Sequence, residues 1–149
     1  QRQSCLRDMM AVATRTLKDT VVNASGAGGK VTILVNWDDE ASSENNILDA
    51  SGLDGHANGA KLDITRIWWA ITGGVADDDQ NWAFIEFKGA SSDTLAINLA
   101  GTGHYDGTAG PITNNATNTT ANSGDLELSL RNSSGSMIIE LRKDENFTS

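Results

Sequence analysis

Leu126-Glu127-Leu128-Ser129-Leu130-Arg131 is the stretch that decides the fold class, because its leucines alternate with polar residues. A period of two places the leucines on one face of an extended strand and the polar side chains on the other. The same alternation recurs in Lys30–Trp37 and Leu95–Leu99. A chain built from such segments, with almost no helical periodicity, is predicted to be an all-β, single-domain β-sandwich of jelly-roll type.

The strands are expected within a domain spanning residues 14–143, between an N-terminal arm or extension (1–13) and a C-terminal tail (144–149). About seven or eight strands fit this length. The segments with strand-like patterns are Thr14–Val22, Lys30–Trp37, Lys61–Ile71, Trp82–Phe87, Leu95–Leu99, Asp125–Arg131 and Met137–Lys143.

Turns and loops are expected between these strands. A phase change at Thr65-Arg66 predicts a β-bulge, and Trp82–Phe87, apolar on both faces, predicts a central strand. Two long polar loops are expected at 38–60 and 106–123, the second as an exposed tip. Asn132–Ser136 is predicted to be the turn of a hairpin.

Composition and charge exclude several functional classes. The 149 residues carry a formal net charge of −9, which argues against a nucleic-acid-binding face, because such faces concentrate Lys and Arg. A single cysteine, Cys5, forms no intrachain disulfide and is expected to be a bystander thiol. The chain has neither an apolar stretch near the roughly 18 residues of a membrane span nor a secretory signal. Met10 offers an alternative start, which would place residues 1–9 outside the domain.

The densest acidic group lies in the first long loop. Its members are Asp38, Asp39, Glu40, Glu44, Asp49 and Asp54. Oxygen ligands this close in sequence could wrap a calcium ion, but their spacing does not match that of an EF-hand loop. A solvated acidic loop is therefore favoured, and neither a metal nor another cofactor is predicted.

His104 and Asp106 are the only hint of catalysis, because a neighbouring carboxylate can orient a histidine base. No Ser or Cys in a nucleophile-like setting stands near them in sequence, so a structural hydrogen-bonding role for His104 is favoured. The chain is predicted not to be an enzyme.

Trp68 and Trp69 are adjacent in a predicted strand and must point to opposite faces. One is expected to fill the core, while the other reaches the opposite sheet face, a loop or a partner. Packing in the core or an interface is favoured over a sugar-binding platform. Phe147 is the only residue of the C-terminal tail able to anchor it.

The chain resembles a family of small virion structural proteins of tailed bacteriophages, of the type found in marine cyanophages. The resemblance covers roughly residues 60–143 and is carried by an ordered set of segments. These are Leu62–Trp69 with its Ile-Trp-Trp sequence, Trp82–Phe87, Leu95–Leu99, Gly101–Gly103, Tyr105-Asp106, Pro111–Asn115, Gly124–Leu126 and Ile138–Lys143.

This resemblance implies a virion component, and small size, acidity and a single sandwich favour a head decoration (cement) protein on the capsid exterior. The expected partners are the major capsid protein and further copies of the chain, as a trimer, with neither nucleic acid nor membrane. The candidate interface residues are Arg2, Arg7, Trp68, Trp69 and Phe147. Two alternatives stay open: a tail, neck or fibre-associated structural protein, and a carbohydrate-binding module that uses Trp68 or Trp82 as its platform.

Overall fold

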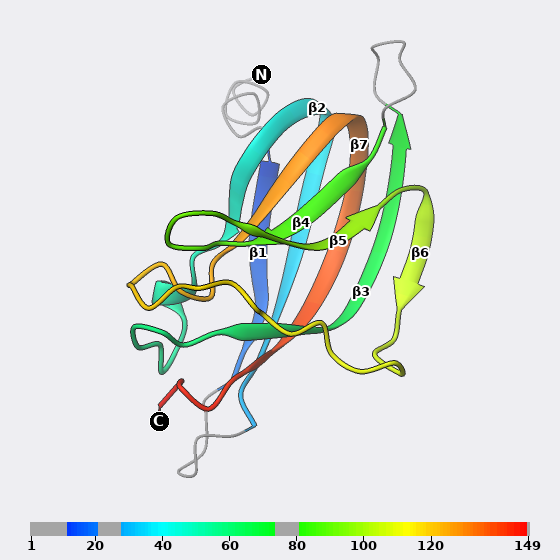
Figure 1. Cartoon of the computed structure of the whole chain (residues 1–149). Coiled ribbons are helices and arrows are strands. Elements are labelled where there is room, and N and C mark those ends of the chain that lie inside the picture. The colour runs from blue at the N-terminus through cyan, green and yellow to red at the C-terminus, as the bar shows by residue number, and fades with distance from the viewer. Residues whose placement is uncertain (1–11, 21–27, 74–80, 149) are drawn as a thin grey trace, which may run out of the picture.

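The computed structural model describes residues 12–20, 28–73 and 81–148, which form one all-β domain (Figure 1). Seven antiparallel strands and one short 3-10 helix, η1, make up its regular structure. In chain order they are β1 (Val12–Asp19), β2 (Lys30–Leu48), η1 (Ala50–Gly52), β3 (Leu62–Gly73), β4 (Ala83–Phe87), β5 (Thr94–Leu99), β6 (Thr102–Tyr105) and β7 (Leu126–Lys143).

All seven strands belong to one hydrogen-bonded sheet that folds over on itself, as expected for a β-sandwich-like domain. The long strands β2 and β7 pair with each other along most of their lengths. Near residues 30–37 of β2 and 135–142 of β7, they are flanked by β1 on one side and by β3 and β6 on the other. Towards the other ends of β2 and β7, β4 and then β5 continue the sheet. Both long strands therefore run through two layers.

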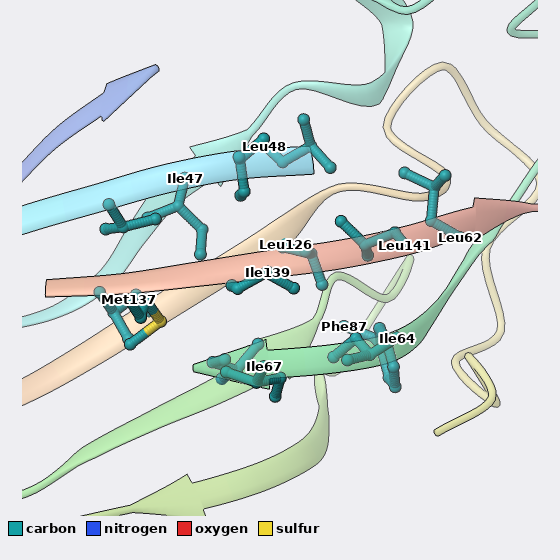
Figure 2. Close-up of a cluster of buried hydrophobic side chains, with 14 of the residues drawn as sticks. Ile47, Leu48, Leu62, Ile64, Ile67, Phe87, Leu126, Met137, Ile139 and Leu141 are labelled. Carbon is teal, nitrogen blue, oxygen red and sulfur yellow. The ribbon is translucent and has the colours of Figure 1, made fainter. Parts of the chain in front are cut away.

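The core lies between these layers and draws on both. Figure 2 shows apolar side chains of β2, β3, β4 and β7 gathered in one cluster. The residues labelled there are Ile47, Leu48, Leu62, Ile64, Ile67, Phe87, Leu126, Met137, Ile139 and Leu141. Burying this many aliphatic side chains is the main favourable term for such a domain.

The strands β2 and β7 curve over at a corner (Figure 1) that contains several β-bulges. The buried Trp37 indole packs at this corner. The pairing of the two strands shifts register several times between Trp37 and Leu48. Asp39 and Asn132 adopt positive φ angles of 48° and 36°. Bulges of this kind bend a strand without ending it.

Two predictions about this corner are wrong. Residues 38–48 were expected to open a polar loop, but they continue β2. Asn132–Ser136 was expected to be a hairpin turn, but these residues continue β7. The segments before and after them, 126–131 and 137–143, therefore lie in different layers and do not pair with each other. Many side chains at the corner face solvent, which explains why they are polar. The backbone there still forms the hydrogen bonds of a strand, so a polar sequence does not mean a loop.

Other expectations about the strands are confirmed. The pairing of β3 with β7 shifts between Ile64 and Arg66, and this is the predicted bulge. β4 lies between β5 and β7, as predicted for a central strand. The start of the first strand differs from its prediction: β1 begins at Val12, two residues before Thr14, and pairs antiparallel with β2.

The second polar loop does lack regular strands, but it is more than an exposed tip. Ala116, Asn118 and Ser123 are buried, and Ile112 forms an isolated bridge with Ile64 of β3. The loop therefore covers part of the core with a few small or polar side chains. The described residues include no helix with the length and hydropathy needed to cross a bilayer.

Candidate binding surfaces

The adjacent tryptophans of β3 point to opposite faces of the sheet, as predicted. Trp69 packs against the core, and its indole Nε1 donates a hydrogen bond of 3.1 Å to the carbonyl oxygen of Ala100. Trp68 faces outward and is 36% exposed. Of the two, Trp68 is the residue that a partner can reach.

Trp68 is held by a ring from the neighbouring strand. It pairs with His104 of β6 in the sheet register, and the two rings stack with centroids 5.0 Å apart and an interplanar angle of 11°. We call this exposed pair the Trp68–His104 patch. Gly103, the residue before His104, leaves room for the other tryptophan, because a Cβ there would lie 2.3 Å from the Trp69 ring.

The contacts of His104 and Asp106 differ from those of a histidine base oriented by a neighbouring carboxylate. His104 uses its face to stack on Trp68. The Asp106 carboxylate accepts a hydrogen bond of 2.9 Å from the Thr108 amide. Hydrogen bonds from Thr108 lower the pKa of Asp106, with a smaller contribution from His104. His104 thus has a structural contact, although this is a stack instead of the hydrogen bond that was expected.

Phe147 was expected to be a candidate interface residue, but it is a core residue. Its side chain is fully buried, meets the His56 ring edge-on at 5.6 Å and lies 5.4 Å from the Lys143 ammonium nitrogen. It anchors the tail, as predicted, and has no surface left for a partner. Arg2 and Arg7 lie outside the described residues.

A second surface lies on the outer side of β4 and β5, where a hollow of about 480 Å³ opens. We call it the β4–β5 hollow; it is lined by Trp82, Phe84, Glu86, Leu95, Asn98, Leu99 and Ala100. The rings of Trp82 and Phe84 stack at 4.8 Å, and the guanidinium of Arg131 lies 5.6 Å from the Trp82 ring.

Leu95 was expected to share the inner face of its strand with Leu99, yet it is 52% exposed at this hollow. The pairing of β5 with β4 shifts register between Ile97 and Leu95. This irregularity breaks the alternation of faces and turns the leucine outward.

A third site was not predicted and consists of three carboxylates from distant parts of the chain. Glu44 of β2, Asp93 of the β4–β5 connection and Glu127 of β7 each place a carboxylate oxygen within 4.8 Å of the other two. We call this set the carboxylate cluster. Only Glu44 belongs to the acidic group singled out in the sequence, because pairing between distant strands brings the other two beside it.

Glu127 is the unusual member of the carboxylate cluster. In the sequence it occupies an outward position between two leucines, yet it is only 5% exposed. Lys88 lies 3.4 Å from its Oε2, while no N–H or hydroxyl group of the described residues donates a hydrogen bond to its buried Oε1. Burial, together with the nearby Asp93 carboxyl, raises the pKa of Glu127 to about 7 against the weaker effect of Lys88.

The charged neighbours of Glu127 also have shifted pKa values. Its carboxylate raises the pKa of Lys88, whereas hydrogen bonds from the Glu127 carboxyl and from the Gly89 amide lower the pKa of Asp93. Burial raises the pKa of Glu86, with smaller effects from Asp93 and Glu44. In the absence of a cation, a proton held between the Asp93 and Glu127 carboxyls relieves part of their repulsion.

No family model matches the chain, and a search among curated proteins finds no match. Three described surfaces carry distinctive chemistry: a stacked aromatic pair, an aromatic hollow and a carboxylate cluster.

Proposed function

We propose that this chain is a virion structural protein of a tailed bacteriophage, and specifically a head decoration protein that binds the major capsid protein on the capsid exterior. The resemblance to small phage virion proteins supports this proposal. Its segments fall on β3, β4, β5, β6 and both ends of β7, together with the 106–123 loop. They thus follow the part of the sheet that carries the Trp68–His104 patch.

The observation that carries the proposal is the Trp68–His104 patch. Large aromatic side chains are enriched at the centres of protein interfaces, where they bury much area for little lost conformational freedom. The patch spans β3 and β6, and within the described residues β6 pairs only with β3. A coat protein that covers it would bury two rings already fixed by stacking, so little ordering would be lost on binding.

Self-association is part of the proposal because other strand edges are also open. Within the described residues, β1 pairs only with β2, and β5 pairs only with β4. Open edges invite pairing between copies unless something covers them. A trimer that covers one edge per subunit would also multiply weak contacts with a repetitive capsid surface.

Copy number in purified particles tests the location. Quantitative mass spectrometry against the major capsid protein is expected to give hundreds of copies per virion for a decoration protein. Tens of copies would support the alternative of a tail, neck or fibre-associated protein. Absence from the particles would contradict a virion role.

Capsid binding by variants tests the patch. Trp68→Ala and His104→Ala are each expected to weaken binding to undecorated capsids at least tenfold, because each removes half of the stack. Leu95→Ala is the matched control, since it removes an exposed apolar side chain from a different surface. Equal binding by all three variants would contradict the assignment of this patch.

The carbohydrate-binding alternative is favoured by one observation, the stacked Trp82 and Phe84 rings beside Glu86 and Asn98 in the β4–β5 hollow. Sugars bind to flat aromatic rings flanked by polar groups. A glycan array with Trp82→Ala as the control distinguishes the two functions. Glycan binding that disappears in this variant would support the alternative, and an array without hits would remove it.

A further inference from the structure

The carboxylate cluster joins three segments that are remote in sequence. They meet on the outer side of the layer that contains β4, β5 and residues 126–130 of β7. Glu44 comes from the bulged part of β2, Glu127 from β7, and Asp93 from the connection that follows β4. The Glu44 amide donates a 3.0 Å hydrogen bond to Ser129 Oγ, and the Gly89 amide donates one of 3.1 Å to Asp93 Oδ1. Main-chain contacts thus hold two of the acidic residues in place.

We propose that Glu44, Asp93 and Glu127 together bind one divalent cation, with Ca²⁺ preferred. This inference does not depend on the proposed function, because it rests only on the geometry of the carboxylate cluster.

The buried oxygen of Glu127 is the observation that points to a ligand. A buried polar atom without a partner is rare in folded proteins, because its lost hydration is not replaced. Oε1 of Glu127 receives no hydrogen bond from an N–H or hydroxyl group of the described residues, although its side chain is more than nine-tenths buried and belongs to the cluster. A bound cation would supply the missing interaction.

The spacing of the oxygens suits Ca²⁺. This ion binds carboxylate oxygens at about 2.3–2.6 Å, so two ligands on opposite sides of it lie about 5 Å apart. The three carboxylates have oxygens within 4.8 Å of one another, which lets all three contact one ion after small side-chain movements. Because Ca²⁺ takes about six to eight oxygens, water molecules would complete its shell.

Charge balance favours a divalent ion. Three ionised carboxylates beside the single ammonium of Lys88 leave a local net charge of −2. Lys88 contacts Oε2 of Glu127 and leaves Oε1 available, so the lysine and a cation need not compete for the same atom. The nearby Glu86 carboxyl makes the surroundings still more favourable for a cation.

A bound ion would fasten the connection between β4 and β5 to the central strands. Asp93 belongs to this connection, whereas Glu44 and Glu127 belong to the two longest strands of the sheet. Cation binding is therefore expected to stabilise the folded chain, because the unfolded chain does not bring these three residues together.

Calorimetric titration of the chelator-treated full chain with CaCl₂ at pH 7.5 tests the proposal, alongside Tm measured with and without Ca²⁺. The wild type is expected to bind about one ion per chain and to show a higher Tm with Ca²⁺. Asp93→Asn and Glu44→Gln are expected to weaken binding at least tenfold and to reduce the Tm shift. Glu44 is exposed, so its variant remains informative if the other one folds poorly.

Glu145→Gln is the matched control, because it removes one exposed negative charge away from the carboxylate cluster; it should bind Ca²⁺ like the wild type. The proposal is overturned if the wild type shows neither heat of binding nor a Tm shift up to millimolar Ca²⁺. It is also overturned if both cluster variants bind as tightly as the wild type. Mg²⁺ should act more weakly because it demands a tighter octahedral shell; an equal response to Mg²⁺ would overturn the preference for Ca²⁺.

Discussion

Trp37 and Ser133 are 96 positions apart in the sequence, yet the indole Nε1 of the first donates a buried hydrogen bond of 3.0 Å to the hydroxyl of the second. The bond crosses between β2 and β7 where the sheet bends. The bond supplies an acceptor for the indole N–H of Trp37, which lets this large apolar ring be buried in the core without an unpaired donor. The corner therefore depends on one specific pair as well as on general apolar burial.

Replacing Ser133 by Ala is expected to lower the free energy of unfolding by about 1–3 kcal/mol, because the Trp37 N–H would be left buried without an acceptor. Urea denaturation followed by tryptophan fluorescence measures this change. Ser136→Ala is the matched control, because this serine is exposed and its hydroxyl donates a hydrogen bond to the Asn36 side chain at the surface; a loss below about 0.5 kcal/mol is expected. Equal losses in the two variants would contradict a special role for the buried bond.

Gly135→Ala is expected to destabilise the corner by about 2 kcal/mol or more, through overpacking. A Cβ at this position would lie 2.6 Å from the Ala70 carbonyl oxygen and 2.9 Å from the Trp37 ring. Gly52→Ala is the control, because a Cβ there meets nothing within 4 Å. Thermal unfolding by circular dichroism compares them, and similar Tm values would show that the corner can relax around a methyl group.

Lys143 should matter far more than its neighbour Arg142. Its buried ammonium lies 2.6 Å from Asp19 Oδ1 and donates to the carbonyl oxygens of Thr20 and Asp54 at 2.8 and 2.7 Å. Lys143→Met is expected to cost about 3 kcal/mol in the free energy of unfolding, because it leaves the partners of a buried ion pair uncompensated.

Arg142→Met provides the comparison for this lysine. The Arg142 side chain is half exposed in its ion pair with Asp63, so its loss is expected to cost about 1 kcal/mol or less. Chemical denaturation of both variants measures the contrast. The interpretation of Lys143 would fail if the arginine variant lost as much stability.

Without divalent cations, Glu127 should make the fold less stable as pH rises. Its pKa is about 7 in the folded chain and near 4.5 when unfolded, so the folded state holds the proton more tightly. This contribution is complete below about pH 4.5 and is lost as pH rises through about 7. Burial is the main cause of this raised pKa, and the charged groups around the carboxyl, which are Lys88, Asp93 and Glu44, adjust its size.

Urea denaturation in EDTA at several pH values from 5 to 8 tests this prediction. The wild type should lose more stability over this range than Glu127→Gln, whose amide does not titrate. The same slope in both proteins would show that Glu127 titrates alike in the folded and unfolded states. Because Asp125 and Glu86 also have raised pKa values, some decline should persist in the variant.

The parts of the fold that could be predicted from the sequence are those where the side-chain pattern reports burial. Alternating leucines located the strand at 126–130, and a change of phase located the bulge at Thr65-Arg66. At Asn132–Ser136 the pattern failed, because a polar corner and a hairpin turn have the same composition. Only the partners of the backbone hydrogen bonds distinguish them.

The candidate sites were harder to predict for a related reason. Trp68 could be singled out because an adjacent tryptophan in the same strand must face the other way. The partnership of Glu44, Asp93 and Glu127 depends on the pairing of β2 with β7, whose partners near Glu127 are more than 80 residues apart in sequence. It also depends on the pairing of β4 with β7, and single-sequence patterns encode neither pairing. The unusual burial of Glu127 follows from the same pairing.

The continuity of β7 has a mechanical consequence. This one strand is hydrogen-bonded to β2, β3 and β4, and therefore to members of both layers. β4 pairs with residues 126–130 of β7 and β3 pairs with residues 133–143, so losing either layer also frees part of a strand on which the other layer depends. Unfolding should thus occur in a single step, and a load applied to one layer should be shared by the other.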